Sequence, residues 1–152
     1  KNTFTLGRAD YQRQYEPILY GWKEGAKHFW CGDRDQSDIW NYKKPHVNDL
    51  HPTMKPVELV ERAIKNSSKT RDIVIDLFGG SGTTLIACEK TNRQARLMEM
   101  DPKYVDVIVK RWEDFTGQKA TRESDGSAFS DLAPEGQSVL DAVGSELEGE
   151  TL

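Results

Sequence analysis

The segment that most constrains the fold is a hydrophobic run that ends in an acid and leads into a glycine-rich turn. It reads D-L-F-G-G-S-G-T-T over residues 76–84. The nearly continuous apolar run Asp72–Phe78 predicts a strand buried on both faces, and Gly79–Gly82 predict a turn that opens a helix over Thr83–Thr91. Glycines let a ligand approach the backbone closely, and a helix start offers unpaired N–H groups to an anion. The segment therefore predicts a site for a nucleotide-like ligand.

Helical and strand patterns alternate around this segment. Pro56 suits the first turn of a helix, Ala95–Met100 reads as the next strand, and Pro102–Phe115 as a helix with Asp101 as its N-cap and Gly117 as its stop. The two helices have apolar faces formed by Leu59, Val60, Ala63 and Ile64, and by Val105, Ile108, Val109 and Trp112. This alternation predicts an α/β fold with a mainly parallel sheet.

The first fifty residues mix aromatic and charged side chains. Glu16–Trp22 reads as a buried strand, because Pro17 at its start is where a missing amide donor does least harm. Lys27–Trp30 reads as a second short strand, and Cys31–Asp49 as an irregular surface loop.

The side chains around the glycine turn narrow the choice of ligand. No Lys follows Gly82, which disfavours a phosphate-binding P-loop, and Leu85 takes the place of the third glycine of a dinucleotide fingerprint. Asp76 would repel a pyrophosphate but suits an ammonium group. Glu99, at the end of the next strand, can accept hydrogen bonds from ribose hydroxyls. An amino acid joined to a nucleoside fits this pattern, and S-adenosylmethionine is such a compound. The alternative is that Asp76 and Glu99 are ordinary acidic residues at strand ends.

Three segments together carry a family resemblance. They are H-P-T-M-K-P at 51–56, the glycine segment at 76–84, and R-L-M-E-M-D-P-K-Y at 96–104. Residues 8–116 resemble the C-terminal part of the DNA amino-methyltransferases that methylate adenine N6 or cytosine N4, in the circularly permuted group whose catalytic segment precedes the cofactor loop. The resemblance implies part of a class I, Rossmann-like methyltransferase fold and S-adenosyl-L-methionine as cofactor.

The resemblance also implies roles for individual residues. The implied cofactor-binding residues are Thr53, Lys55 and Pro56, then Asp76, Phe78, Gly79, Gly80, Ser81, Gly82 and Thr83, and finally Glu99 at the ribose and Met100 beside the adenine. The family's catalytic tetrapeptide, (D/N/S)-P-P-(Y/F/W), does not occur in the sequence, so no catalytic residue is assigned in this chain. In the permuted order that motif would precede Lys1. We therefore expect the chain to be the cofactor-binding portion of a longer, site-specific methyltransferase of a restriction-modification system, inactive alone.

The expected partners are double-stranded DNA and the missing N-terminal part of the same enzyme. Six basic residues, interleaved with aromatic ones, are candidate DNA contacts: Arg8, Arg13, Lys27, Arg34, Lys43 and Lys44. Neighbouring acids at Asp33, Asp35 and Asp38 leave a solvated mixed surface equally open. We disfavour a zinc site formed by His28, Cys31, His46 and His51, because these residues are spaced along an aromatic loop. We therefore assign no metal.

Three further questions stay open on the sequence. The chain could be a degenerate remnant or one half of a split enzyme, and a dinucleotide-binding oxidoreductase fragment is a third reading. Nothing in the sequence distinguishes adenine from cytosine, and adenine is favoured only by its frequency in the family. Neither Cys31 nor Cys88 follows a Pro or has an evident activating neighbour, which disfavours a cysteine-dependent C5-cytosine methyltransferase.

Charge divides the chain of 152 residues into two parts. Residues 1–116 carry a net charge of +2 and residues 117–152 carry −6. We expect 1–116 to be methyltransferase domain, with a strand and loop region over 1–50 and a β-α-β-α cofactor unit over 51–116, and 117–152 to be an acidic, mostly disordered tail. No stretch has the roughly 18 apolar residues of a membrane span, and the two cysteines suit a reducing compartment, so we expect a cytoplasmic protein without membrane contact.

Overall fold

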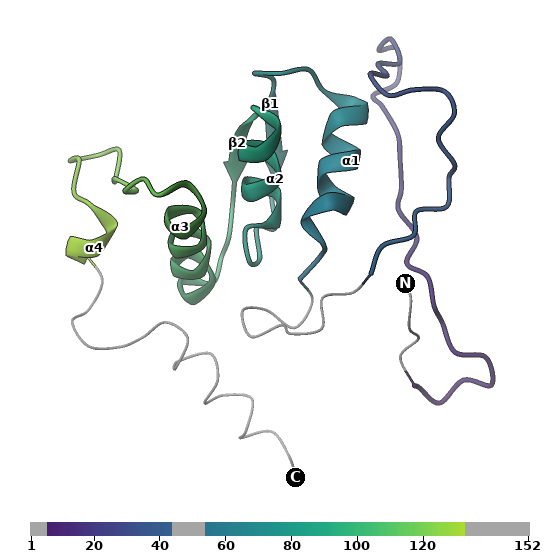
Figure 1. The fold of residues 1–152 in the computed structure, drawn as a ribbon, viewed down its shortest axis with the longest axis horizontal. Coiled ribbons are helices and arrows are strands. Elements are labelled where there is room, and N and C mark those ends of the chain that lie inside the picture. The colour runs from purple at the N-terminus through teal and green to yellow at the C-terminus, as the bar shows by residue number, and fades with distance from the viewer. Residues whose placement is uncertain (1–5, 44–53, 133–152) are drawn as a thin grey trace.

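The computed structural model describes residues 6–43 and 54–132, and its regular elements lie in the second range (Figure 1). In chain order they are α1 (Val57–Ser67), β1 (Ile73–Asp76), α2 (Thr83–Thr91), β2 (Gln94–Leu97), α3 (Pro102–Thr116) and α4 (Phe129–Leu132). The predicted alternation of helix and strand is confirmed, with strands shorter than the apolar runs that predicted them.

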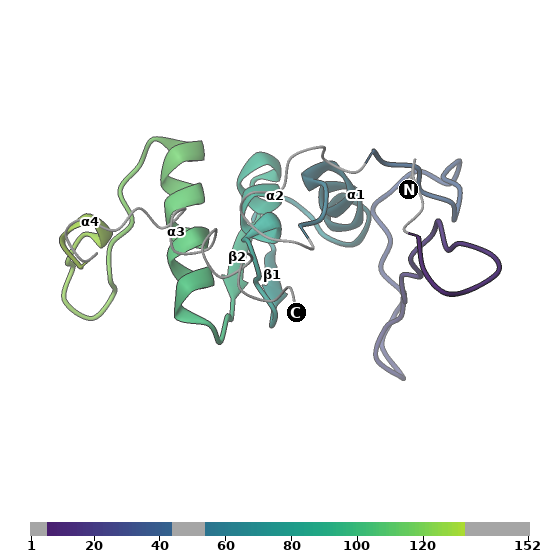
Figure 2. The same ribbon diagram turned by 90° about the horizontal axis from the view of Figure 1, so that it is seen from below.

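β1 and β2 form a parallel pair joined by the crossover helix α2. Ile73 pairs with Gln94 and Asp76 with Leu97 at the two ends of the register. α1 and α2 lie on one side of the strands (Figure 2). Side chains alternate across a strand, so Ile73 and Ile75 point to the other side and are 59% and 68% exposed. The prediction that this strand is buried on both faces is therefore wrong for the described chain, which covers only one face of the pair.

The core lies between the helix pair and the covered face of the strands. Ile64 of α1 and Ala87 and Cys88 of α2 are its buried members, and the half-buried residues packed against them are Val57, Val60, Val74 and Ala95. Cys88 is fully buried in this core. Ala63 is exposed, contrary to prediction, because the buried stripe of α1 runs through positions 57, 60 and 64.

The ends of α3 follow its sequence signals. The Asp101 side chain accepts a 2.9 Å hydrogen bond from the Lys103 amide, and Gly117, at φ 71°, ends the helix. Both predictions are confirmed. The buried face is displaced from the predicted one, since Val107 and Ile108 are buried whereas Val105 is 38% exposed.

Residues 6–43 contain no helix or strand. The prediction of a buried strand over Glu16–Trp22 is wrong here: Leu19 is 98% exposed, and no described strand pairs with this segment. Strand pairing requires a neighbouring backbone, which a local apolar pattern does not supply. Lys27–Trp30 is also not a strand, although its His28 accepts or donates a 2.7 Å hydrogen bond with the Tyr20 hydroxyl.

The loop expected at Cys31–Asp49 is irregular as far as residue 43, and its remaining residues lie outside the described ranges. Within the predicted acidic tail, Thr121 and Ala128 form an isolated antiparallel bridge before α4, so this part has local structure that we did not predict. Residues 133–152 lie outside the described ranges. None of the helices in the described ranges has the length and apolar character needed to cross a bilayer.

Candidate cofactor site

Backbone hydrogen bonds hold the glycine turn against the chain that leaves β2. The Gly79 amide donates to the Met98 carbonyl at 2.8 Å, and the Gly82 amide closes the turn by donating to the Gly79 carbonyl at 2.8 Å. Gly80 and Gly82 have φ values of 52° and 77°, which side chains other than glycine rarely allow. The turn at Gly79–Gly82, followed by α2, is as predicted.

Asp76 is fixed by two bonds where β1 ends. The Phe78 amide donates to its Oδ1 at 3.0 Å, and the Thr84 hydroxyl donates to its Oδ2 at 2.6 Å. Asp76 is half-buried, so the carboxylate faces the start of α2 with a defined orientation. Thr84 belongs to the glycine segment but sequence reasoning did not assign it a role.

Glu99 connects the chain after β2 to the glycine turn. Its Oε2 accepts from the Gly80 amide at 2.7 Å, and its Oε1 accepts from the amides of Met100 and Asp101 at 2.9 and 3.0 Å. Asp76 is the last residue of β1 and Glu99 follows the end of β2, so the two acids of the predicted site lie at the same end of the sheet, with the glycine turn between them. This is the end of a parallel sheet at which ligands bind in open α/β folds.

α3 packs directly on the turn. A Cβ atom at Gly82 would lie 3.1 Å from Ile108 Cγ2, and one at Gly79 would lie 3.1 Å from Ile108 Cδ1. One helical turn later, Arg111 Nη1 donates to the Ser81 carbonyl at 2.9 Å. Burial lowers the pKa of Arg111, because it disfavours the charged guanidinium. Sequence reasoning missed Arg111, since nothing in the local pattern shows that this helix face meets the turn.

Residues before α1 reach the same end of the sheet through the backbone. The Thr83 hydroxyl donates to the Lys55 carbonyl at 3.4 Å, and Pro56 is the half-buried N-cap of α1. The Lys55 ammonium is bound elsewhere, in an ion pair with Glu16 at 2.6 Å. Thr53 lies outside the described residues.

Two apolar side chains beside the acids are open to solvent. Phe78 is 88% exposed and Met100 is 96% exposed. Phe78 lies between β1 and the glycine turn, and Met100 lies between β2 and α3. Exposed apolar side chains at one edge of a polar site provide a surface on which a base can stack.

The predicted DNA contacts are dispersed along the N-terminal region. Arg8, Arg13, Lys27, Arg34 and Lys43 are exposed, and Lys44 lies outside the described residues. The five described residues all lie outside helices and strands, in a region that carries both signs of charge. Their contact with DNA stays a prediction.

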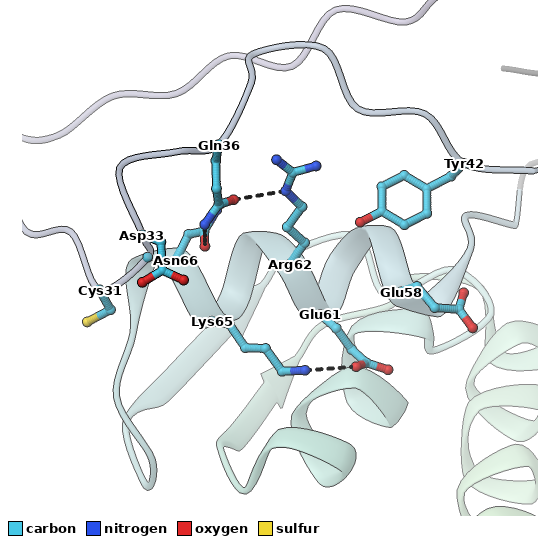
Figure 3. Close-up of a pocket in the computed structure, with 10 residues that line it drawn as sticks. Cys31, Asp33, Gln36, Tyr42, Glu58, Glu61, Arg62, Lys65 and Asn66 are labelled. Carbon is cyan, nitrogen blue, oxygen red and sulfur yellow. Dashed lines mark hydrogen bonds and ion pairs between the residues drawn. The ribbon is translucent and has the colours of Figure 1, made fainter.

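A surface depression of about 450 Å³ lies elsewhere, between α1 and the loop that crosses it (Figure 3). Its polar side chains already have partners: Arg62 Nε donates to Gln36 Oε1 at 2.9 Å, and Glu61 pairs with Lys65 at 3.3 Å and with Lys90 of α2. Burial would raise the pKa of Glu61, but the two lysines outweigh it and the pKa lies below its usual value. These internal pairs make the depression a packing feature of the loop, and none of its lining residues belongs to the glycine turn. In the described ranges, no group of three or more His, Cys, Asp or Glu side chains is placed to hold a metal ion.

The whole sequence from residue 3 to residue 110 matches the N6/N4 methyltransferase family, described as DNA methylase. That range covers more than half of the chain and includes β1, α2, β2 and most of α3. The chain belongs to this family of DNA methylases.

Curated relatives support the same family. The chain is 36% identical over 80 residues to the type II methyltransferase M.Cfr9I of Citrobacter freundii, covering 53% of this chain and 27% of that protein. It is 45% identical over 85 residues to M1.MboII of Moraxella bovis, covering 50% of this chain and 31% of that protein. The chain thus spans about a third or less of the relatives it matches.

Among solved structures, the complex of M1.HpyAVI with S-adenosylmethionine superposes with a TM-score of 0.52. It is 30% identical, and the match covers 59% of this chain and 46% of that one. The fold is therefore part of an S-adenosylmethionine-dependent methyltransferase fold, as predicted.

Proposed function

We propose that this chain binds S-adenosyl-L-methionine as the cofactor portion of a DNA methyltransferase acting on adenine N6 or cytosine N4. One observation carries the proposal: the glycine turn is bonded to Glu99 on one side and followed by a helix that holds Asp76 on the other. The family match and the cofactor named in the M1.HpyAVI complex support the same choice.

The residues of the turn fit the separate parts of this cofactor. The first N–H groups of α2 have no partner within the helix and suit the carboxylate, while Asp76 suits the ammonium. Glu99 suits the ribose hydroxyls, and the exposed Met100 and Phe78 suit the adenine. When bound, the cofactor supplies an electrophilic methyl group on its sulfonium.

The remaining roles that we assign follow the family order. Lys55 and Pro56 enclose the methionine end from the start of α1, where the Lys55 carbonyl already contacts Thr83. The binding site for the target base, with its catalytic tetrapeptide, belongs to the missing N-terminal part. We propose that this part is the direct partner of residues 1–116. Double-stranded DNA is the substrate of the completed enzyme, and the chain alone transfers no methyl group.

The cysteines support transfer to an amino nitrogen. Cys88 is fully buried, and burial raises the pKa of its thiol, so it is not available as a thiolate nucleophile. Cys31 lies in the loop over α1, where its amide donates to the Asn66 carbonyl at 2.7 Å. An amino nitrogen needs no thiol addition.

Calorimetric titration of the chain with S-adenosylmethionine, S-adenosylhomocysteine and NAD tests the cofactor. We expect binding of the first two and none of NAD. Binding of NAD alone would instead favour the oxidoreductase fragment. The degenerate or split-enzyme reading is tested by adding the upstream polypeptide and measuring methyl transfer from tritiated cofactor to DNA, followed by identification of the modified base.

A further inference from the structure

Arg111 of α3 holds the buried part of the glycine turn. Besides the 2.9 Å bond to the Ser81 carbonyl, its Nη1 lies 3.3 Å from the hydroxyl oxygens of both Ser81 and Thr83. Ser81 and Thr83 are only 5% and 7% exposed. A guanidinium nitrogen can donate two hydrogen bonds, so Arg111 restrains the backbone where the turn becomes helix α2.

The same helix face contacts the turn through Ile108. Ile108 and Arg111 are three positions apart, so they lie next to each other on α3. Ile108 limits the space at Gly82, while Arg111 fixes the direction of the Ser81 carbonyl. Together they determine where the first amides of α2 point.

The adenosine side of the turn is restrained differently. There the Gly80 amide donates to Glu99, which also accepts from the amides that follow it. None of the atoms bonded by Arg111 is shared with this set. The two sides of the turn can therefore respond separately to substitution.

We propose that Arg111 is a positioning residue for the amino acid end of the cofactor. It acts through Ser81, by holding the amides of α2 where the carboxylate binds, and does not touch the ligand itself. This inference rests on the proposed function, since it deepens the assignment of that end of the site. A positioning residue of this kind affects the affinity for the amino acid half of the ligand alone, whereas a residue that only stabilises the fold affects the affinity for both halves.

The experiment compares two ligands on the 152-residue chain carrying Arg111→Met, which keeps an apolar stem but removes the donor. S-adenosylhomocysteine contains the amino acid group, whereas 5′-methylthioadenosine lacks it. We expect the dissociation constant of S-adenosylhomocysteine to rise about fivefold, the effect of one net hydrogen bond, and that of 5′-methylthioadenosine to stay unchanged. Lys110→Met, at the exposed neighbouring position, is the matched control and should change neither.

Equal weakening of both ligands, or no weakening, would overturn the role of Arg111 while leaving cofactor binding intact. If the unsubstituted chain binds neither ligand, the proposed function itself has failed, so the two failures are distinct. Thermal unfolding reports whether each variant folds. Should Arg111→Met not fold, Arg111→Lys replaces it: its shorter, differently placed donor should give the same selective loss, and a non-selective result would again overturn the inference.

Discussion

Glu99 and Asp76 each bind backbone or side-chain donors of their own chain, so their substitution tests both the turn and the ligand. Glu99→Gln and Asp76→Asn should each lower the affinity for S-adenosylmethionine by about 1–3 kcal/mol, since each removes a charged acceptor. Calorimetry measures the affinity, and thermal unfolding reports the cost to the turn. Asp125→Asn is the control, because that carboxylate pairs with Arg122 in the tail. Unchanged affinity in a folded Glu99→Gln protein would contradict the ribose assignment.

The two thiols should differ sharply in reactivity. Cys31 is exposed, whereas Cys88 is buried and its thiol pKa is raised by that burial. Because the thiolate is the reactive form, we expect Ellman's reagent to modify one cysteine quickly in the native chain and both after unfolding in denaturant. Cys31→Ser should remove the fast phase. A fast-reacting thiol in that variant, which retains only Cys88, would mean that α2 does not pack as described.

The candidate site illustrates which residues a sequence reveals. Asp76, Glu99 and the glycines were predictable, because they follow apolar strand patterns and have few other reasons to occur together. Thr84 and Arg111 were not, since a threonine in a first helical turn and an arginine on a helix are common. Their role depends on bonds to Asp76 and Ser81 that only the packed structure shows.

The packing of α3 on the turn depends on a missing side chain at Gly82. Gly82 and Gly117 share a positive φ, 77° and 71°, but only Gly82 has a neighbour, Ile108, within contact of an added Cβ. Gly117→Ala should therefore cost about 1 kcal/mol of unfolding free energy for the backbone alone, and Gly82→Ala about 2–4 kcal/mol. Urea denaturation measures both.

Removing the contacting atoms of Ile108 provides the control for this comparison. Ile108→Ala deletes Cγ2 and Cγ1, which would lie 3.1 and 3.2 Å from the new Cβ, so it should cost less unfolding free energy in the Gly82→Ala background than in the unsubstituted chain. Equal costs for the two glycine substitutions would show that Ile108 does not press on the turn.

The elements that were predicted correctly are those specified by local pattern. α2, α3 and the caps Asp101 and Gly117 depend on residues within a few positions of one another. Glu16–Trp22 failed because a strand is defined by the strand beside it, and the described chain places none there. The shift of the buried face on α3 has the same origin, since the partner surface decides which apolar residues are covered.

The face of β1 and β2 that the described residues leave uncovered is a candidate contact surface for the rest of a larger protein. Parallel strands are normally covered on both faces, and the match covers only 27% of the length of M.Cfr9I. We propose that the remainder of the enzyme covers Ile73 and Ile75, which the described chain leaves exposed.

Neighbouring positions on β1 provide the test. Ile75→Lys should change the stability of the isolated chain by less than about 0.5 kcal/mol, because the side chain is already in water. It should lower by at least about tenfold the methyl transfer restored by adding the upstream polypeptide, since a lysine there would be buried unpaired.

Val74→Lys is the opposite control, because Val74 packs against the core. It should destabilise the isolated chain by about 3 kcal/mol or more. If Ile75→Lys supports full restoration, the outer face is not where the rest of the enzyme binds.

The bonds that restrain the glycine turn also affect how the protein is made. They join residues 8, 19 and 30 positions apart, from Asp76 to Thr84, Gly80 to Glu99, and Ser81 to Arg111. Contacts over such short separations close quickly, because little chain entropy is lost in bringing their ends together. On a ribosome, the turn, both acids and their anchors can therefore meet as soon as α3 has emerged, while later residues are still being translated.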